Sequence, residues 1–88
     1  MKERYLEVTF RRGQPVAAYL YLPRQSGDVS TRTERRERGL LVDFAADGRP
    51  IGIEITSPSG LTPAALNRVL LALNQAPVTD EELKPLAA

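Results

Sequence analysis

Hydrophobic and polar residues alternate along most of residues 5–55, and this two-residue period predicts strands that are buried on one face. The first such run holds Leu6, Val8 and Phe10, with polar residues between them. Further runs predict strands at residues 17–22, 29–34, 40–44 and 51–55. The connections between these runs are short and rich in turn residues. We therefore expect a five-stranded antiparallel sheet in meander order.

The hairpin between the last two predicted strands constrains its own register. Asp47 and Gly48 stand between two apolar runs, which is a strong turn signal because glycine adopts positive φ at low cost. The pairs expected on the buried face are Phe44 with Ile51 and Val42 with Ile53. A slip of one residue would bury the carboxylate of Asp43 without a partner. We therefore expect Asp43, Glu54 and Leu41 on the opposite face.

After the sheet, the hydrophobic period changes to that of a helix. Thr62 is a suitable N-cap, and Pro63 suits the first helical position. The apolar stripe that follows consists of Leu66, Val69, Leu70 and Leu73. This stripe predicts a helix over about 63–74 that packs on the apolar face of the sheet. A capping box that begins at Thr79 predicts a short helix over about 80–84.

These elements make a single α+β domain over residues 1–88, with the sheet over about 5–55. The chain holds no histidine and no cysteine, which excludes disulfides, zinc sites of the usual kind and His- or Cys-dependent catalysis. A net charge of +1 does not point to nucleic acid. No apolar run approaches the ~20 residues of a membrane span, and the start of the chain does not resemble a signal peptide. We therefore expect a cytoplasmic protein with no cofactor and no membrane contact.

Two segments carry a resemblance to a known family. Residues 39–55 read GLLVDFAADGRPIGIEI, and residues 19–22 read YLYL. Together they resemble the family of small bacterial and archaeal proteins catalogued as domain of unknown function 2283. The resemblance covers about residues 5–55 and departs from the family pattern at Val16 and Ala45. It implies a small curled antiparallel sheet with a C-terminal helix, no established activity, and an antitoxin or regulatory role alongside toxin-like neighbours.

The carboxylates of the predicted hairpin raise two chemical hypotheses. The spacing of Asp43, Asp47, Gly48 and Glu54 matches ligand positions and the glycine of a calcium loop. Ala45 replaces one ligand, however, and strands flank this loop where the calcium motif has helices. Asp43 and Glu54 also form a candidate acid–base pair for a hydrolase. The simpler interpretation is turn and register chemistry without a metal, in which Gly52 completes the motif without an assigned role.

Tyrosines supply the most distinctive surface that the pattern predicts. Tyr5, Tyr19 and Tyr21 are expected on the face away from the isoleucines, next to Leu41. Aromatic side chains among charged ones are typical of protein interfaces. We therefore expect a partner-binding surface that includes Tyr19, Tyr21, Arg32 and Leu41. A homodimer or one small protein partner would use it.

One arginine-rich run, residues 31–38, raises a nucleic-acid hypothesis because arginines contact phosphates. Glu34 and Glu37 interrupt the run, and alternating charge is also typical of an exposed edge strand. We therefore favour a non-enzymatic protein that self-associates or binds one protein partner. The alternatives are an antitoxin-like regulator that binds a toxin-like protein or nucleic acid, and a small metal-binding protein or hydrolase that uses Asp43, Asp47 and Glu54.

Overall fold

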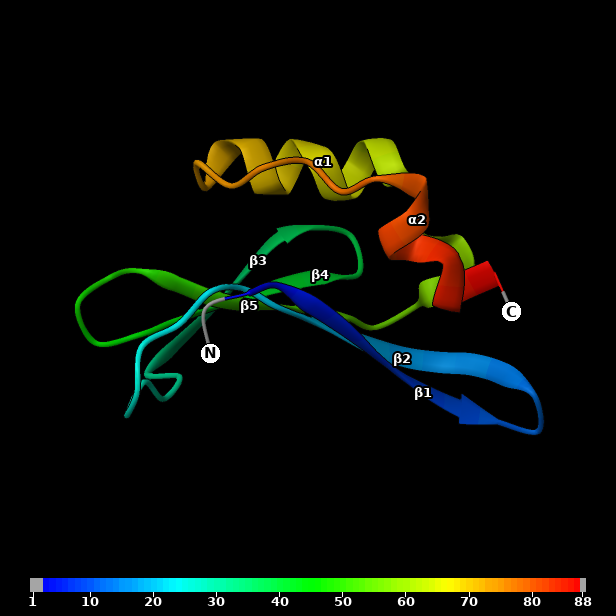
Figure 1. The fold of residues 1–88 in the computed structure, drawn as a ribbon, viewed down its shortest axis with the longest axis horizontal. Coiled ribbons are helices and arrows are strands. Elements are labelled where there is room, and N and C mark those ends of the chain that lie inside the picture. The colour runs from blue at the N-terminus through cyan, green and yellow to red at the C-terminus, as the bar shows by residue number, and fades with distance from the viewer. Residues whose placement is uncertain (1–2, 88) are drawn as a thin grey trace.

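A computed structural model describes residues 3–87 of the chain. Its sheet consists of β1 (Tyr5–Arg11), β2 (Gln14–Tyr21), β3 (Arg32–Glu37), β4 (Leu40–Phe44) and β5 (Pro50–Ile55). The helical segments are η1 (Pro58–Gly60), α1 (Pro63–Ala72), α2 (Asp80–Leu83) and η2 (Lys84–Ala87). All strand pairs are antiparallel, and α1, α2 and η2 lie on one side of the sheet (Figure 1). The predicted α+β class is therefore confirmed.

The strand order is β1-β2-β5-β4-β3, so the expected meander order is wrong. The chain leaves β2, crosses one end of the sheet, and enters the far edge as β3 before two hairpins return it to the side of β2 (Figure 1). This is a connection of the Greek-key type. Its physical cause is hydrophobic: the apolar faces of β2, β5 and β4 occupy the middle of the sheet, and the pairing of β2 with β5 sets Leu20 against Ile53. The charged β3 is left at the edge, where its side chains reach water.

The β4–β5 register agrees with the expected one at its centre and differs near the turn. Val42 lies opposite Ile53, as predicted. Phe44 lies opposite Pro50 and not Ile51, because the register shifts between Asp43 and Phe44. The shift shortens the connection between the paired residues from 45–50 to 45–49, and within it the amide of Gly48 donates to the carbonyl of Ala45 (3.0 Å).

The third strand also begins later than expected. We predicted it from residue 29, but β3 starts at Arg32 and Val29 is 66% exposed. The backbone amide of Thr31 donates to the carbonyl of Phe44 (2.9 Å), which begins the pairing with β4. The preceding residues belong to the long connection from β2.

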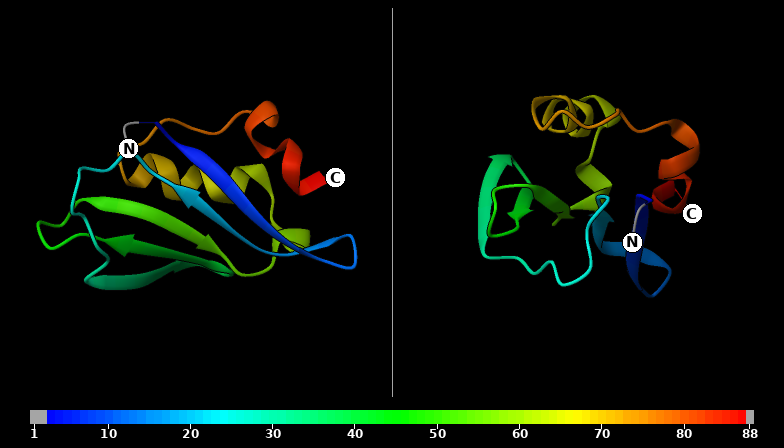
Figure 2. Two further views of the ribbon diagram at one scale, coloured as in Figure 1. Left: turned by 60° about the horizontal axis from the view of Figure 1, so that its bottom comes forward. Right: turned by 60° about the vertical axis from the view of Figure 1, so that its left-hand side comes forward.

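Helix α1 forms the second layer over the apolar face of the sheet (Figure 2). The side chain of Thr62 accepts a hydrogen bond from the amide of Ala65 (3.1 Å), which confirms the predicted N-cap. The fully buried core combines residues of the sheet and α1: Leu20, Leu22, Leu40, Val42, Ile51, Ile53, Ile55, Leu66 and Leu70. The helix ends at Ala72, two residues before the predicted end, and Asn74 leaves it in the left-handed conformation, at a φ of 59°.

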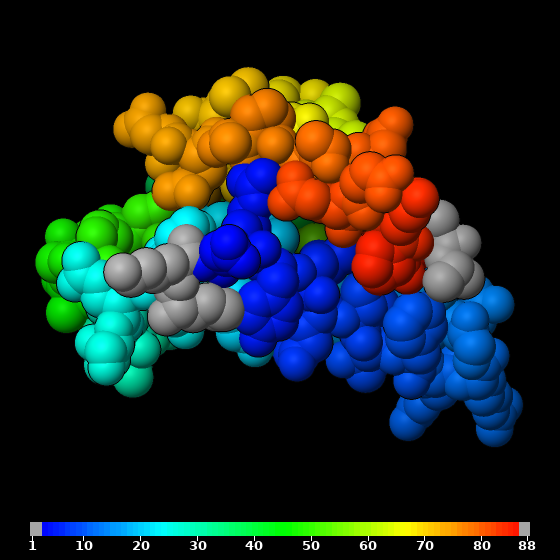
Figure 3. All heavy atoms as spheres, in the orientation of Figure 1, coloured from blue at the N-terminus to red at the C-terminus, as the bar shows by residue number. Residues whose placement is uncertain are grey.

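The chain after α1, residues 75–87, returns over the start of β1, and we call it the C-terminal segment. Its predicted capping box is present, with Thr79 and Glu82 bonding each other's backbone amides. The Arg4 guanidinium donates to both carboxylate oxygens of Glu82 (3.0 Å each) and to the carbonyls of Ala76 and Pro77. These bonds connect the two ends of the chain. Figure 3 shows the C-terminal segment along one border of β1.

Candidate functional site

The outer face of the sheet, opposite to α1, is ordered into two rows of side chains. Cross-strand pairing fixes both rows, because residues directly opposite each other in antiparallel strands point to the same face. The first row is Glu7, Tyr19, Glu54, Leu41 and Arg35. The second row is Tyr5, Tyr21, Gly52, Asp43 and Thr33. Each row crosses all five strands, so residues far apart in sequence become neighbours.

Tyr19 occupies the place that the missing side chain of Gly52 leaves open. A Cβ atom at Gly52 would stand 2.0 Å from the Tyr19 hydroxyl oxygen and 2.3 Å from the ring carbon that bears it. The same hydroxyl donates a hydrogen bond of 2.7 Å to Oδ2 of Asp43. Burial, with the Asp43 carboxylate adding to it, raises the pKa of Tyr19 well above its ordinary value. Tyr19 is therefore a neutral hydrogen-bond donor at physiological pH.

Asp43 uses both carboxylate oxygens inside the protein. Oδ2 accepts from Tyr19, and Oδ1 accepts from the hydroxyl of Thr33 in β3. These two bonds link three strands of the sheet across its outer face. The side chain is thereby held in one orientation, and its role in the structure is to position Tyr19.

Three tyrosines form one aromatic cluster, which we call the tyrosine cluster: Tyr5, Tyr19 and Tyr21. The rings of Tyr5 and Tyr21 stack at 4.5 Å between centroids, and those of Tyr19 and Tyr21 meet edge-on at 4.7 Å. The guanidinium of Arg24, in the connection after β2, lies 5.2 Å from the centroid of the Tyr21 ring. Desolvation, followed by the charge of Glu7, raises the pKa of Tyr21. Tyr5 remains 46% exposed, so the cluster is accessible from solvent.

Arg32 does not belong to this surface, contrary to our expectation. It lies opposite Phe44, with its guanidinium 4.3 Å from the centroid of the Phe44 ring, and pairs with Glu34 (2.9 Å). Phe44 is a core residue, so Arg32 is on the face that bears α1. Arg35, opposite Leu41, is on the outer face in the place expected for Arg32. Leu41 itself lies on the outer face, as predicted, but in the first row Glu54 stands between it and Tyr19.

The arginine-rich run likewise does not form one basic surface. Arg36 lies 5.5 Å from the Phe44 ring, on the face of Arg32, and pairs with Glu34 (3.3 Å). Arg35 points to the outer face, and Arg38 lies in the turn after β3. The basic groups are thus divided between two faces and a turn.

The turn of the β4–β5 hairpin is occupied by a salt-bridge network that sequence reasoning missed. Arg49 pairs with Asp47 (2.6 Å) and, through two nitrogens, with Asp28 (2.8 and 3.1 Å). The Arg49 guanidinium holds the pKa of both carboxyls below their usual range. Asp47 also accepts from the backbone amide of Arg49. The Asp47–Arg49 spacing signals a local turn, but no pattern in the sequence identifies the distant Asp28.

The hairpin carboxylates proposed as a calcium or hydrolase site have separate partners. Asp43 binds Tyr19 and Thr33, whereas Asp47 binds Arg49. Glu54 is exposed in the first row, beside Tyr19 and Leu41. Within residues 3–87, no group of three or more carboxylates lies close enough to hold a metal ion. The structure therefore does not bring the proposed ligand set together.

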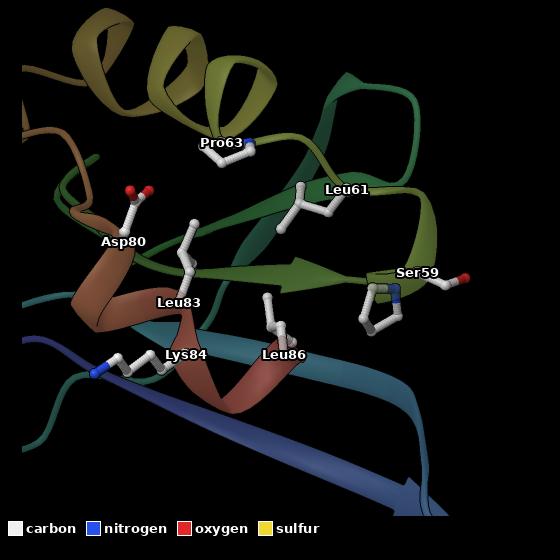
Figure 4. A pocket seen from close by; sticks show the side chains of 8 residues that line it. Ser59, Leu61, Pro63, Asp80, Leu83, Lys84 and Leu86 are labelled. Carbon is white, nitrogen blue, oxygen red and sulfur yellow. The ribbon is translucent and has the colours of Figure 1, made fainter. Parts of the chain in front are cut away.

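A hollow of about 400 Å³ lies between η1, the start of α1 and the C-terminal segment. Figure 4 shows Leu61, Leu83 and Leu86 directed toward it, while the charged end of Lys84 points away. Its lining within residues 3–87 is mainly apolar, and the charged residues there are Asp80 and Lys84. This hollow offers contact to an apolar group but no arrangement of acid, base or nucleophile.

No helix in the described part of the chain is long and apolar enough to span a membrane. Comparison of the chain with protein families, with curated protein sequences and with solved structures finds no match. The most distinctive surface of the protein is therefore its outer sheet face, with the tyrosine cluster and the two rows of side chains.

Proposed function

We propose that this protein is a non-enzymatic, cytoplasmic binding module whose outer sheet face binds another protein. One observation carries the proposal: the tyrosine cluster is already ordered on a sheet face that neither α1 nor the C-terminal segment covers (Figure 2). Binding through rings that are already held costs little conformational entropy. Tyrosines also combine a large apolar area with a polar tip, which suits an interface.

The charges around the cluster favour a protein over a nucleic acid. Arg35 lies at one end of the first row, whereas Glu7 lies at the other end and Glu54 in the middle. A partner surface with an apolar centre and a rim of both charges fits this pattern. Nucleic acid would instead require a surface of mainly positive charge. The antitoxin-like role that the family resemblance implies is one form of this proposal.

Site-specific photo-crosslinking tests the proposal in cells of the natural host. A benzophenone amino acid replaces Tyr21 in one variant and Leu71, 60% exposed on α1, in a control variant. We expect a protein product several-fold more abundant from position 21, with a mass that distinguishes a second copy from a different partner. Leu41→Lys should reduce this product, because it replaces an apolar side chain of the outer face with a charged one. Equal products from both positions, or none from position 21, would overturn the proposal.

A further inference from the structure

The two edge strands of the sheet differ in their capacity to accept another strand. β3 reads RTERRE, so five of its six side chains are charged, which is a common protection of a sheet edge. β1 reads YLEVTFR and has two charged side chains among seven. Among the described residues, the backbone of β1 is paired only with β2. β1 is therefore the edge at which a further strand can be added.

β1 also carries an exposed aromatic residue near one end and a partly apolar hollow near the other. Phe10, the sixth of the seven residues of β1, is 45% exposed. The β1–β2 hairpin extends past the helices (Figure 1). A hollow of about 200 Å³ lies between the first half of β1 and the C-terminal segment. Its lining combines apolar side chains, Leu6, Leu20 and Leu83 among them, with the charged Arg4, Glu81 and Glu82. β1 thus presents an exposed aromatic side chain at one end and a hollow that can receive such a side chain at the other end.

A two-fold axis would bring the aromatic side chain and the hollow together. In an antiparallel pair of identical strands, outward residues must lie opposite outward residues if the sheet is to continue. With Val8 on the axis, all seven residues of β1 are paired. The opposed pairs are then Tyr5 with Arg11, Leu6 with Phe10, and Glu7 with Thr9. Placing Glu7 on the axis would instead set two carboxylates directly against each other, which is destabilising.

We propose that β1 pairs antiparallel with β1 of a second copy of this chain, with Val8 on the two-fold axis. Phe10 of each copy then lies at the hollow beside Leu6 of the other copy. Glu7 lies diagonally across from both Arg11 and Glu7 of the second copy, so the attraction to the arginine opposes the repulsion between the two carboxylates. The two outer faces become continuous and present both tyrosine clusters on one surface. This contact uses a different surface from the proposed function and stands independently of it.

Sedimentation equilibrium on the full chain tests the proposal with a matched pair of substitutions. Phe10→Lys and Val16→Lys change side chains of nearly equal exposure, 45% and 44%, in the same hairpin, but only Phe10 is on the edge strand. We expect the wild type to dimerise and Phe10→Lys to weaken the dimer at least about tenfold, while Val16→Lys leaves it unchanged. A monomeric wild type at about 1 mM, or equal effects of both substitutions, would overturn the proposal.

Disulfide trapping tests the register and does not depend on Phe10. The chain contains no cysteine, so each introduced thiol is the sole one. Val8→Cys should oxidise to a covalent homodimer, and a mixture of Glu7→Cys with Thr9→Cys should give the mixed dimer. Arg35→Cys, on the opposite edge strand, should stay monomeric. Trapping at residue 35 as efficient as at residue 8, or a Thr9→Cys homodimer that forms faster than the mixed dimer, would overturn the register.

Discussion

The ring of Tyr19 lies across Gly52, where a Cβ atom would stand 2.0 Å from the tyrosine hydroxyl oxygen. This glycine is not in a turn, and no positive φ requires it. It is required because its missing side chain leaves room for a tyrosine from the neighbouring strand. The hydroxyl of Tyr19 can then reach Asp43 on the next strand at 2.7 Å. The glycine therefore determines where the tyrosine cluster is held.

Gly52→Ala should destabilise the protein by about 1–3 kcal/mol, because the added methyl group displaces the Tyr19 ring. Urea unfolding measures the loss, and Gly60→Ala, where a Cβ meets nothing within 4 Å, is the control. In a Tyr19→Ala background the cost of Gly52→Ala should largely disappear. An undiminished cost in that background would show that Tyr19 is not the reason for the glycine.

Tyr19→Phe should cost about 1 kcal/mol, because it removes the hydrogen bond to the Asp43 carboxylate. It should also reduce the loss of stability at alkaline pH. The pKa of Tyr19 is raised in the folded state, so its stabilising contribution is complete below the unfolded value of about 10 and is lost as the pH rises above it. Urea midpoints at about pH 8 and 11 should therefore differ less for Tyr19→Phe than for the wild type. A Tyr19→Phe variant that keeps the full wild-type difference would contradict the assignment.

Arg49→Gln should lower the free energy of unfolding at neutral pH. The further decrease in this free energy on acidification should be smaller than in the wild type. Arg49 holds the pKa of Asp28 and of Asp47 below its usual range. Their contribution is thus present above the unfolded pKa of about 3.9 and is lost as the pH falls through the lower folded values. Urea midpoints at about pH 7 and 2.5 check this, with Arg35→Gln as the control. The prediction fails if both variants retain the acid slope of the wild type.

Arg4→Gln should loosen the C-terminal segment from β1 while leaving the sheet intact. Arg4 provides the bonds to Glu82, Ala76 and Pro77 that connect the chain ends. Hydrogen exchange of the α2 amides should speed up by about tenfold, with β4 and β5 unchanged. Lys84→Gln, which removes an exposed pair with Glu81, should have little effect. Unchanged exchange in Arg4→Gln would indicate that apolar contacts alone hold the segment.

Local sequence patterns specify the strands and helices of this protein. Alternation of apolar and polar residues identified β1, β2, β4 and β5, because a strand with one buried face carries its orientation in its own pattern. The caps at Thr62 and Thr79 identified both helix starts, since capping bonds join residues three positions apart. The same alternation placed Tyr19, Tyr21, Leu41 and Asp43 on one face.

How those elements pack together depends on contacts between residues that are far apart in the chain. β3 carries charged residues on both faces, so its pattern does not indicate which of its side chains face the core. For this reason Arg32 was expected on the wrong side of the sheet. The place of β3 at the far edge depends on the pairing of β2 with β5, which joins residues more than thirty positions apart. The role of Gly52 and the Arg49–Asp28 pair depend on such contacts as well. Local patterns determine which face of a strand is buried, but only the packing of the whole core determines which strands become neighbours.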